Sequence, residues 1–158
     1  MVRSTTKKVT ITNSSEISPR YPVMNVIVDT AIWSLALRRN SPEMNAALVN
    51  QLRSLIANGR VIMLGSIRQE ILSGVRTSEQ FDRLRNTLHA FPDLNLVDAD
   101  YELAAEFCNT CRRNGIQGSN TDFLICAAAH RRSYSIFTTD RDFHNFQAHI
   151  PVNFLEFE

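Results

Sequence analysis

The stretch Asn25-Val26-Ile27-Val28-Asp29-Thr30 is a short β-branched run that stops at an acid, and helical periodicity follows at once from Trp33 to Leu37. A parallel strand that ends in a carboxylate and passes into a helix fits this pattern. The stretch Ser135-Ile136-Phe137-Thr138-Thr139-Asp140 repeats the pattern, because it is again an apolar run that stops at an acid. Carboxylates at such strand ends can converge on one crevice.

Strand and helix patterns alternate along the rest of the chain. Apolar runs predict strands at 24–29, 61–64, 94–97, 135–139 and 152–157. Helical spacing predicts helices near 31–38, from Ser41-Pro42-Glu43 to Asn58-Gly59, near 66–75, 78–90, 100–114 and 121–132, and a short helical turn after 139. Strands that alternate with helices imply a parallel sheet with helices on both faces, which is an α/β fold.

The first 23 residues differ in composition from the rest. Residues 1–23 are rich in Ser and Thr, contain few large apolar groups and end at Pro22 before Met24. We interpret them as a flexible N-terminal extension and residues 24–158 as one folded domain that starts at Met24.

Composition favours an ordinary cytoplasmic protein. With 158 residues, 44% of them hydrophobic, the chain can bury about two thirds of its unfolded surface. No apolar run approaches the ~20 residues of a membrane span, and no signal peptide is recognisable. Three cysteines are too few for a disulfide framework and indicate a reducing compartment. Since no second Cys or His pair lies at ligand spacing, we interpret Cys108, Cys111 and Cys126 as small core residues.

Charge is unevenly distributed. Residues 1–23 hold four basic residues against one acidic residue, whereas 24–158 hold 13 basic and 15 acidic residues, so nucleic-acid binding must rest on a local patch or on metal ions. Every basic residue after Lys8 is arginine. The arginines that could contact phosphates, or simply lie on solvated helix faces, are Arg38, Arg39, Arg68, Arg112, Arg113, Arg131, Arg132 and Arg141.

Two further acids lie on predicted helices. At 100° per residue Asp122 shares the apolar face of Ile125 and Cys126, and Glu70 lies at the edge of the stripe that contains Ile67. Each acid, taken alone, could also cap a helix, begin a turn or face solvent. Carboxylates near a core need partners, however, and the domain has no lysine to supply one.

A cluster of these carboxylates would repel itself unless a divalent cation neutralised it. The four acids in question are Asp29, Glu70, Asp122 and Asp140. A hard oxygen site of this kind suits Mg²⁺ or Mn²⁺, ions that also bind substrate phosphates. The sequence therefore predicts metal-dependent hydrolysis of phosphodiesters, in which the metal lowers the pKa of an attacking water.

Four motif blocks carry a family resemblance. They are Val28-Asp29-Thr30-Ala31-Ile32-Trp33, Arg68-Gln69-Glu70-Ile71-Leu72, Asn120-Thr121-Asp122-Phe123-Leu124-Ile125-Cys126-Ala127-Ala128-Ala129 and Thr138-Thr139-Asp140-Arg141-Asp142-Phe143. In this order and at these spacings, residues 24–158 resemble PIN-domain ribonucleases, and most of all the bacterial VapC toxins of toxin–antitoxin pairs.

The resemblance implies a three-layer α/β/α PIN-like fold with a mainly parallel sheet, Mg²⁺-dependent endoribonuclease activity, a homodimer, and inhibition by a small antitoxin protein whose tail enters the active-site groove. By motif matching, Asp29, Glu70 and Asp122 are the core metal ligands. Asp140, alone or with Asp142, is the fourth acid, and Thr30 and Thr138 orient ligands or water. The extension before the first strand departs from the family pattern.

Other functions remain open at this stage. The domain could be a housekeeping PIN-domain nuclease, or a degenerate PIN scaffold that only binds RNA or a partner. A receiver-type phosphorylation switch requires a lysine late in the fold, which this chain lacks. A Toprim-like nuclease would use Asp140-x-Asp142, but its first strand would end in Glu, and here that strand ends in Asp29.

Overall fold

The computed structural model describes residues 24–38 and 43–156. Its sheet has three parallel strands in the order β2-β1-β3, namely β1 (Val26–Val28), β2 (Val61–Ile62) and β3 (Ser135–Phe137). Ile27 of the central strand pairs with Ile62 on one side and with Ile136 on the other. The strands predicted at 24–29, 61–64 and 135–139 are therefore confirmed, although each is shorter than expected.

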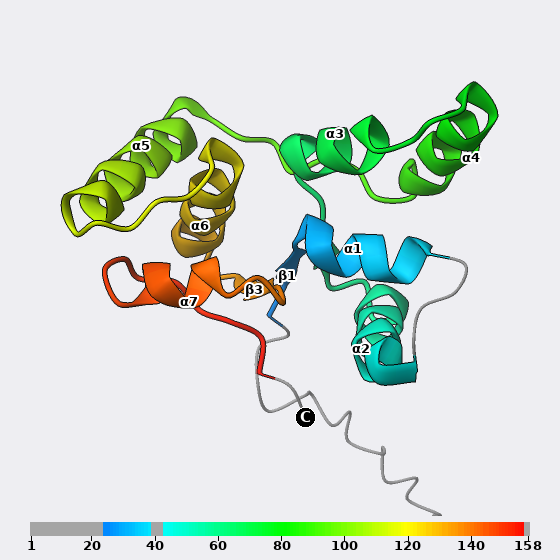
Figure 1. The fold of residues 1–158 in the computed structure, drawn as a ribbon, viewed down its shortest axis with the longest axis horizontal. Helices are drawn as coiled ribbons and strands as arrows, with labels where there is room; N and C mark the ends of the chain where they lie inside the picture. The colour runs from blue at the N-terminus through cyan, green and yellow to red at the C-terminus, as the bar shows by residue number, and fades with distance from the viewer. Residues whose placement is uncertain (1–23, 39–42, 157–158) are drawn as a thin grey trace, which may run out of the picture.

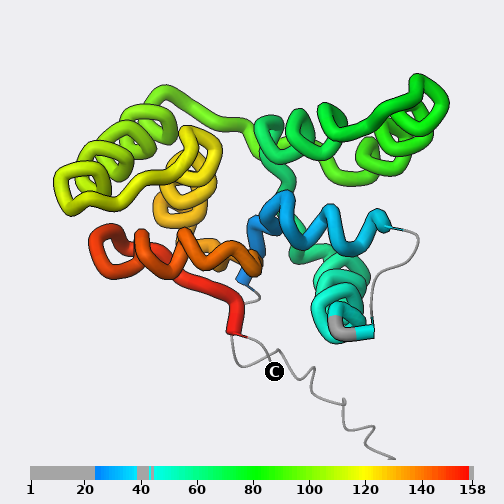
Figure 2. Tube along the Cα trace, viewed as in Figure 1, coloured from blue at the N-terminus to red at the C-terminus, as the bar shows by residue number. Residues whose placement is uncertain are grey.

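Helices fill most of the remaining described sequence. They are α1 (Thr30–Leu37), the 3-10 turn η1 (Glu43–Asn45), α2 (Ala46–Ala57), α3 (Gly65–Ser73), α4 (Ser78–Leu88), α5 (Asp98–Arg113), α6 (Asn120–Arg132) and α7 (Asp142–Gln147). Figures 1 and 2 show the sheet in the centre, with α5, α6 and α7 to one side and α1 to α4 to the other. The predicted α/β fold with helices on both faces of a parallel sheet is confirmed.

Strands β1 and β3 are buried on both faces, as their continuous apolar residues require, whereas both residues of the edge strand β2 are partly exposed. All three residues of β1 are fully buried, and so are Ile136 and Phe137 of β3. The run from Ile125 to Ala129 on α6 is also fully buried, and small side chains there let the helix approach its neighbours closely. The core thus fixes the two strand ends and the helix that carry Asp29, Asp140 and Asp122.

Two predicted strands are wrong in extent. The strand expected at 94–97 does not form: a single parallel bridge joins Met63 to Asp93, the residue before that segment, and the Val97 N–H donates to Asp100 at the start of α5. The strand expected at 152–157 is likewise a single bridge between Ile136 and Phe154, within the residues that the structure describes.

Other expectations meet the structure only in part. Cys111 and Cys126 are fully buried free thiols, as predicted for core residues, whereas Cys108 is partly exposed. The extension 1–23 and the helix start at Ser41-Pro42 lie outside the described residues. Within residues 24–38 and 43–156, no helix combines the length and the apolar character that crossing a membrane requires.

Candidate active site

Asp29 is the first residue after β1 and caps α1. One carboxylate oxygen, Oδ1, accepts a hydrogen bond from the Thr30 backbone N–H at 2.7 Å. The other, Oδ2, accepts from the Thr138 hydroxyl at 2.8 Å. Because Thr138 directly follows β3, this contact joins the carboxyl ends of two neighbouring strands. Asp29 is only 7% exposed, so its carboxylate is held in one position.

Glu70 reaches the same region from α3. The Thr30 hydroxyl donates to Glu70 Oε2 at 2.7 Å. Thr30 therefore holds two acids at once, Asp29 through its backbone N–H and Glu70 through its side chain. Glu70 is exposed, in contrast to Asp29, and faces the solvent side of the site.

Asp122 is the third residue of α6 and forms a capping box with Ser119. The Ser119 N–H donates to Asp122 Oδ2 at 2.8 Å, and the Asp122 N–H donates to the Ser119 hydroxyl at 3.1 Å. The N-terminal turn of a helix is the positive end of its dipole, which favours a carboxylate there. The pattern Ser-x-x-Asp marks such a cap, and it is the sequence signal that identifies Ser119.

Asp140 lies in the turn between β3 and α7, and Asp142 is the first residue of α7. The Asp140 N–H donates to the Thr138 hydroxyl at 3.0 Å, and Asp140 Oδ1 accepts from the Asp142 N–H at 2.9 Å. Thr138 thus links Asp140 to Asp29 through one hydroxyl. Asp142 contributes its backbone N–H to this turn and is exposed at the start of α7.

The environment of Asp29 destabilises its charge. Burial raises the pKa of Asp29 above its ordinary value, while the hydrogen bonds from Thr138 and Thr30 oppose the rise. The negative charges of Asp122 and Asp140 raise it further. These three carboxylates therefore lie close enough to repel one another.

The pKa of Asp122 is raised for the same kinds of reason. Burial raises its pKa, the two contacts with Ser119 lower it, and the charges of Asp140 and Glu70 raise it. Together with the hydrogen bonds of Thr30 and Thr138, this repulsion connects Asp29, Glu70, Asp122 and Asp140 into one acidic cluster.

The acidic cluster lacks a cationic partner among the described residues. The ion pairs of that part of the chain are formed by Asp93, Glu79, Asp82 and Asp100, and none involves an acid of the cluster. Four mutually repelling carboxylates without an arginine or lysine form a donor set that suits a hard divalent cation. Within residues 24–38 and 43–156, no group of three or more His, Cys, Asp or Glu side chains is close enough together to hold a metal ion as it stands.

Several arginines considered for phosphate binding have structural partners instead. Arg68 forms an ion pair with Asp93 and donates to the Leu88 and Phe91 carbonyl oxygens. Arg131 and Arg132 both bind Asp100.

Asp100 is a buried group that sequence reasoning missed. It is fully buried, and its partners lie more than 30 positions further along the chain, so no local pattern reveals the contact. The resulting ion cluster ties the start of α5 to the end of α6, the helix that carries Asp122 at its other end.

The family model described as PIN domain matches residues 26–148. No curated protein sequence matches the chain.

Solved structures resemble the chain in fold. FitAcB from Neisseria gonorrhoeae has 20% sequence identity and a TM-score of 0.66, covering 83% of this chain and 96% of that one. VapBC2 from Rickettsia felis, bound to a DNA fragment from their promoter, has 20% identity and a TM-score of 0.66, covering 84% and 98%. VapBC-1 from nontypeable Haemophilus influenzae has 17% identity and a TM-score of 0.64, covering 85% and 98%. At these identities the likeness concerns the fold alone.

Proposed function

Because the chain belongs to the PIN domain family, whose members are nucleases, we propose that it is a metal-dependent endoribonuclease and the toxin of a toxin–antitoxin pair. The observation that carries this proposal is the acidic cluster, whose four carboxylates repel one another and have no cationic partner among the described residues. The resemblance of the four motif blocks to VapC toxins supports the narrower role.

In this proposal the acidic cluster binds the metal ion. Asp29, Glu70 and Asp122 would hold Mg²⁺ or Mn²⁺, and Asp140 would be the fourth acid, with Asp142 beside it. When bound, such a cation lowers the pKa of an attacking water and stabilises the charge that develops on the leaving oxygen.

The chain's own residues position this chemistry. Thr138 and the Thr30 N–H fix both oxygens of Asp29, and the Thr30 hydroxyl orients Glu70. The N-terminal turn of α6 places its partial positive charge beside Asp122, where it also favours an approaching phosphate. Thr30 and Thr138 therefore act as positioning residues.

A cleavage assay tests the proposal. Purified protein should cleave structured RNA with Mg²⁺ or Mn²⁺ and stop in EDTA, and Asp29→Asn or Asp122→Asn should abolish cleavage. Asp98→Asn is a matched control, because Asp98 is exposed and lies in the first turn of α5, as Asp122 does in α6. Cleavage that survives EDTA would rule out the metal mechanism.

The alternatives give different results in the same system. RNA binding without cleavage under any metal would identify a degenerate scaffold. Cleavage by a protein that is harmless when expressed alone would identify a housekeeping PIN nuclease. The toxin role instead predicts growth arrest on expression, and recovery when a small antitoxin is co-expressed. Such a partner would place an Arg or Lys in the acidic cluster and so relieve its repulsion.

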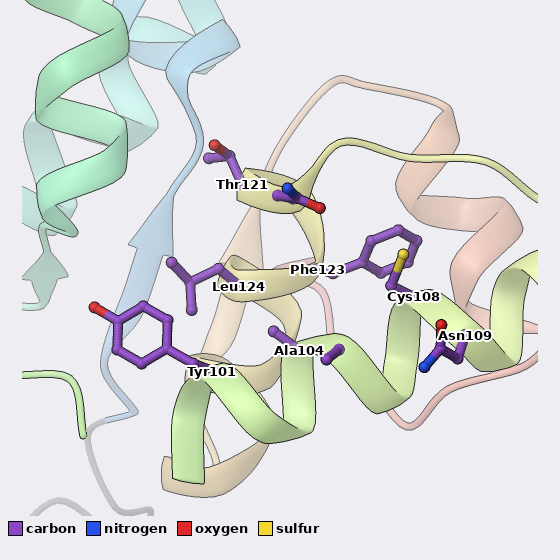
Figure 3. Close-up of a pocket in the computed structure, with 9 residues that line it drawn as sticks. Tyr101, Ala104, Cys108, Asn109, Thr121, Phe123 and Leu124 are labelled. Atoms are coloured by element: carbon purple, nitrogen blue, oxygen red, sulfur yellow. The ribbon is translucent and has the colours of Figure 1, made fainter. Parts of the chain in front are cut away.

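We also propose that the protein forms a homodimer, through the exposed apolar side of α5. Val97 and Tyr101 are 45% and 54% exposed, and Tyr101 borders a cavity of about 450 Å³ between α5 and α6 (Figure 3). That cavity is lined by Tyr101, Ala104, Ala105, Cys108, Asn109, Asn120, Thr121, Phe123 and Leu124.

Light scattering should give a dimer mass for the wild-type protein, and Tyr101→Glu should give a monomer. Ile56→Glu, an exposed apolar position on α2, is the control. An unchanged mass for Tyr101→Glu would reject this surface.

A further inference from the structure

Glu70 is held differently from the other acids of the acidic cluster. Backbone N–H groups donate to Asp29, Asp122 and Asp140. Glu70 is instead held by the Thr30 hydroxyl at 2.7 Å, in a bond between the side chains of two different helices. The position of the Glu70 carboxylate therefore depends on how α3 is fixed relative to α1, the helix on which it packs (Figure 1).

Arg68 lies two residues before Glu70 on α3. Because each helical residue advances by about 100°, the two side chains point to nearly opposite sides of the helix. All three guanidinium nitrogens of Arg68 have acceptors. Nε donates to Asp93 Oδ1 at 2.8 Å, Nη1 donates to the Leu88 carbonyl oxygen at 3.0 Å, and Nη2 donates to the Phe91 carbonyl oxygen. Arg68 thus ties α3 to the 88–93 segment, which contains the end of α4 and the chain that follows it.

The 88–93 segment also contacts the start of α3. The residue before this helix, Leu64, provides no side-chain cap, and a Cβ atom at Gly65 would lie 3.4 Å from Asp93 Oδ2. The Asp93 carboxylate therefore lies beside the N-terminal end of α3, where the helix dipole favours a negative charge. The 88–93 segment holds α3 at two points, Gly65 and Arg68.

The same segment reaches α1 as well. The Phe91 and Trp33 rings make a T-shaped contact, with 5.1 Å between the ring centroids. Trp33 is buried and lies three residues after Thr30, so the two residues are neighbours on one side of α1. The Thr30 hydroxyl joins α1 to α3 directly. Arg68, Phe91 and Trp33 join the same two helices a second time.

We propose that Arg68 is a positioning residue for Glu70. By fixing α3 against the 88–93 segment, Arg68 keeps the Glu70 carboxylate within reach of a metal ion bound to Asp29 and Asp122. This assignment rests on the proposed function and adds to it a residue that contacts neither the metal nor the RNA. Removing an outer partner of this kind commonly weakens metal binding by about 10- to 100-fold.

Mn²⁺ binding to the full chain, without RNA, tests the assignment independently of activity. The electron paramagnetic resonance signal of free Mn²⁺ gives the bound fraction in a titration. Arg68→Ala should weaken binding about tenfold. Removing a positive charge by itself would strengthen cation binding, so a weakening has the opposite sign to a plain charge effect. Arg85→Ala is the matched control and should not weaken binding, because Arg85 forms its ion pair with Asp82 on the exposed surface of α4.

A double-mutant cycle with Glu70→Gln shows whether Arg68 acts through Glu70. In the Glu70→Gln background, Arg68→Ala should cause no further loss of Mn²⁺ affinity. A role confined to folding predicts a lower urea midpoint with unchanged affinity, under conditions where both proteins are folded. If Arg68→Ala does not fold, Phe91→Leu decides in its place, since it removes the ring contact with Trp33 and keeps the carbonyl oxygen that Arg68 binds. It too should weaken Mn²⁺ binding only when Glu70 is present.

The outcomes separate this inference from the proposed function. If the wild-type protein binds no Mn²⁺, the metal-dependent function fails and the role of Arg68 fails with it. If the wild-type protein binds Mn²⁺ and Arg68→Ala binds it equally well, the metal site stands and Arg68 has no positioning role. An equal loss with and without Glu70 would show that Arg68 acts on the whole fold instead of through Glu70. A loss that disappears in the Glu70→Gln background supports the assignment.

Discussion

Replacing Asp100 with asparagine tests how the helix that carries Asp122 is held in place. Asp100 is fully buried, and its Oδ1 accepts hydrogen bonds from Arg131 and Arg132, each at 2.7 Å. Its Oδ2 accepts from Arg132 and from the Val97 N–H, each at 2.9 Å. The two arginines end α6, so this single carboxylate clamps α6 to the start of α5.

The structure sets the size of the effect. A hydrogen bond to a charged group contributes about 1.5–3 kcal/mol, and removing one partner of a buried ion pair costs about 3–5 kcal/mol. The Arg131 and Arg132 side chains retain 34% and 20% exposure, so water compensates part of the loss. An asparagine oxygen also still accepts one bond. We therefore expect Asp100→Asn to lower the free energy of unfolding by about 2–3 kcal/mol.

Urea unfolding at neutral pH measures this difference, with the m-value as a check that the unfolding transition is unchanged. Asp98→Asn is the control, because Asp98 lies in the same helical turn but is exposed, and its loss should cost no more than about 0.5 kcal/mol. If Asp100→Asn is as stable as Asp98→Asn, the contacts of Asp100 with Arg131 and Arg132 contribute nothing to the stability of the fold.

The pH dependence provides a second check on the same clamp. The hydrogen bonds from Arg132 hold the pKa of Asp100 well below its ordinary value of 3.8. A lowered pKa gives stabilisation that is complete above the ordinary value and is lost as the pH falls below it. The gap between wild type and Asp100→Asn should therefore be constant down to about pH 5 and shrink in stronger acid.

Further tests address the acidic cluster, a packed glycine and the start of the domain. In EDTA, Asp29→Asn should melt no lower than wild type, because it removes a buried charge and its repulsion; a clearly lower melting temperature would mean that the lost hydrogen bonds dominate. Gly118→Ala should cost about 1–3 kcal/mol in urea unfolding, since its Cβ would lie 2.5 Å from Phe146 Cζ and 3.1 Å from Phe123 Cε2; an unchanged midpoint would show that the rings yield. A chain that starts at Met24 should melt cooperatively and cleave RNA normally, and loss of folding would show that residues 1–23 pack as part of the domain.

Local patterns in the sequence were sufficient for the framework of the fold. The run Val26–Val28 that stops at Asp29, and the run Ser135–Phe137 that leads to Asp140, predicted two parallel strands, because burial on both faces demands continuous apolar residues. The PIN resemblance stated from the motif blocks is confirmed by the family match. The helical face shared by Asp122 and Ile125 also placed α6 against the core.

Contacts between residues that are far apart in the sequence could not be predicted from such local patterns. The Thr138 bond to Asp29 spans 109 positions and the Thr30 bond to Glu70 spans 40, so their geometry exists only in the folded chain. The segment 94–97 has the composition of a strand, yet the bridge to Met63 is made by Asp93 just before it, and the Val97 N–H donates to Asp100 at the start of α5. Whether an apolar run becomes a strand depends on its partner as well as on its own residues.

Anomalous diffraction from crystals grown with Mn²⁺ shows directly whether the acidic cluster is a metal centre, because it locates the ion without relying on activity. We expect a peak between the carboxylates of Asp29, Glu70 and Asp122, with Asp140 nearby, and its loss in Asp122→Asn crystals grown in the same way. Well-ordered crystals with no peak among these residues, or with a peak only at another position, would contradict the assignment of the acidic cluster as the metal centre.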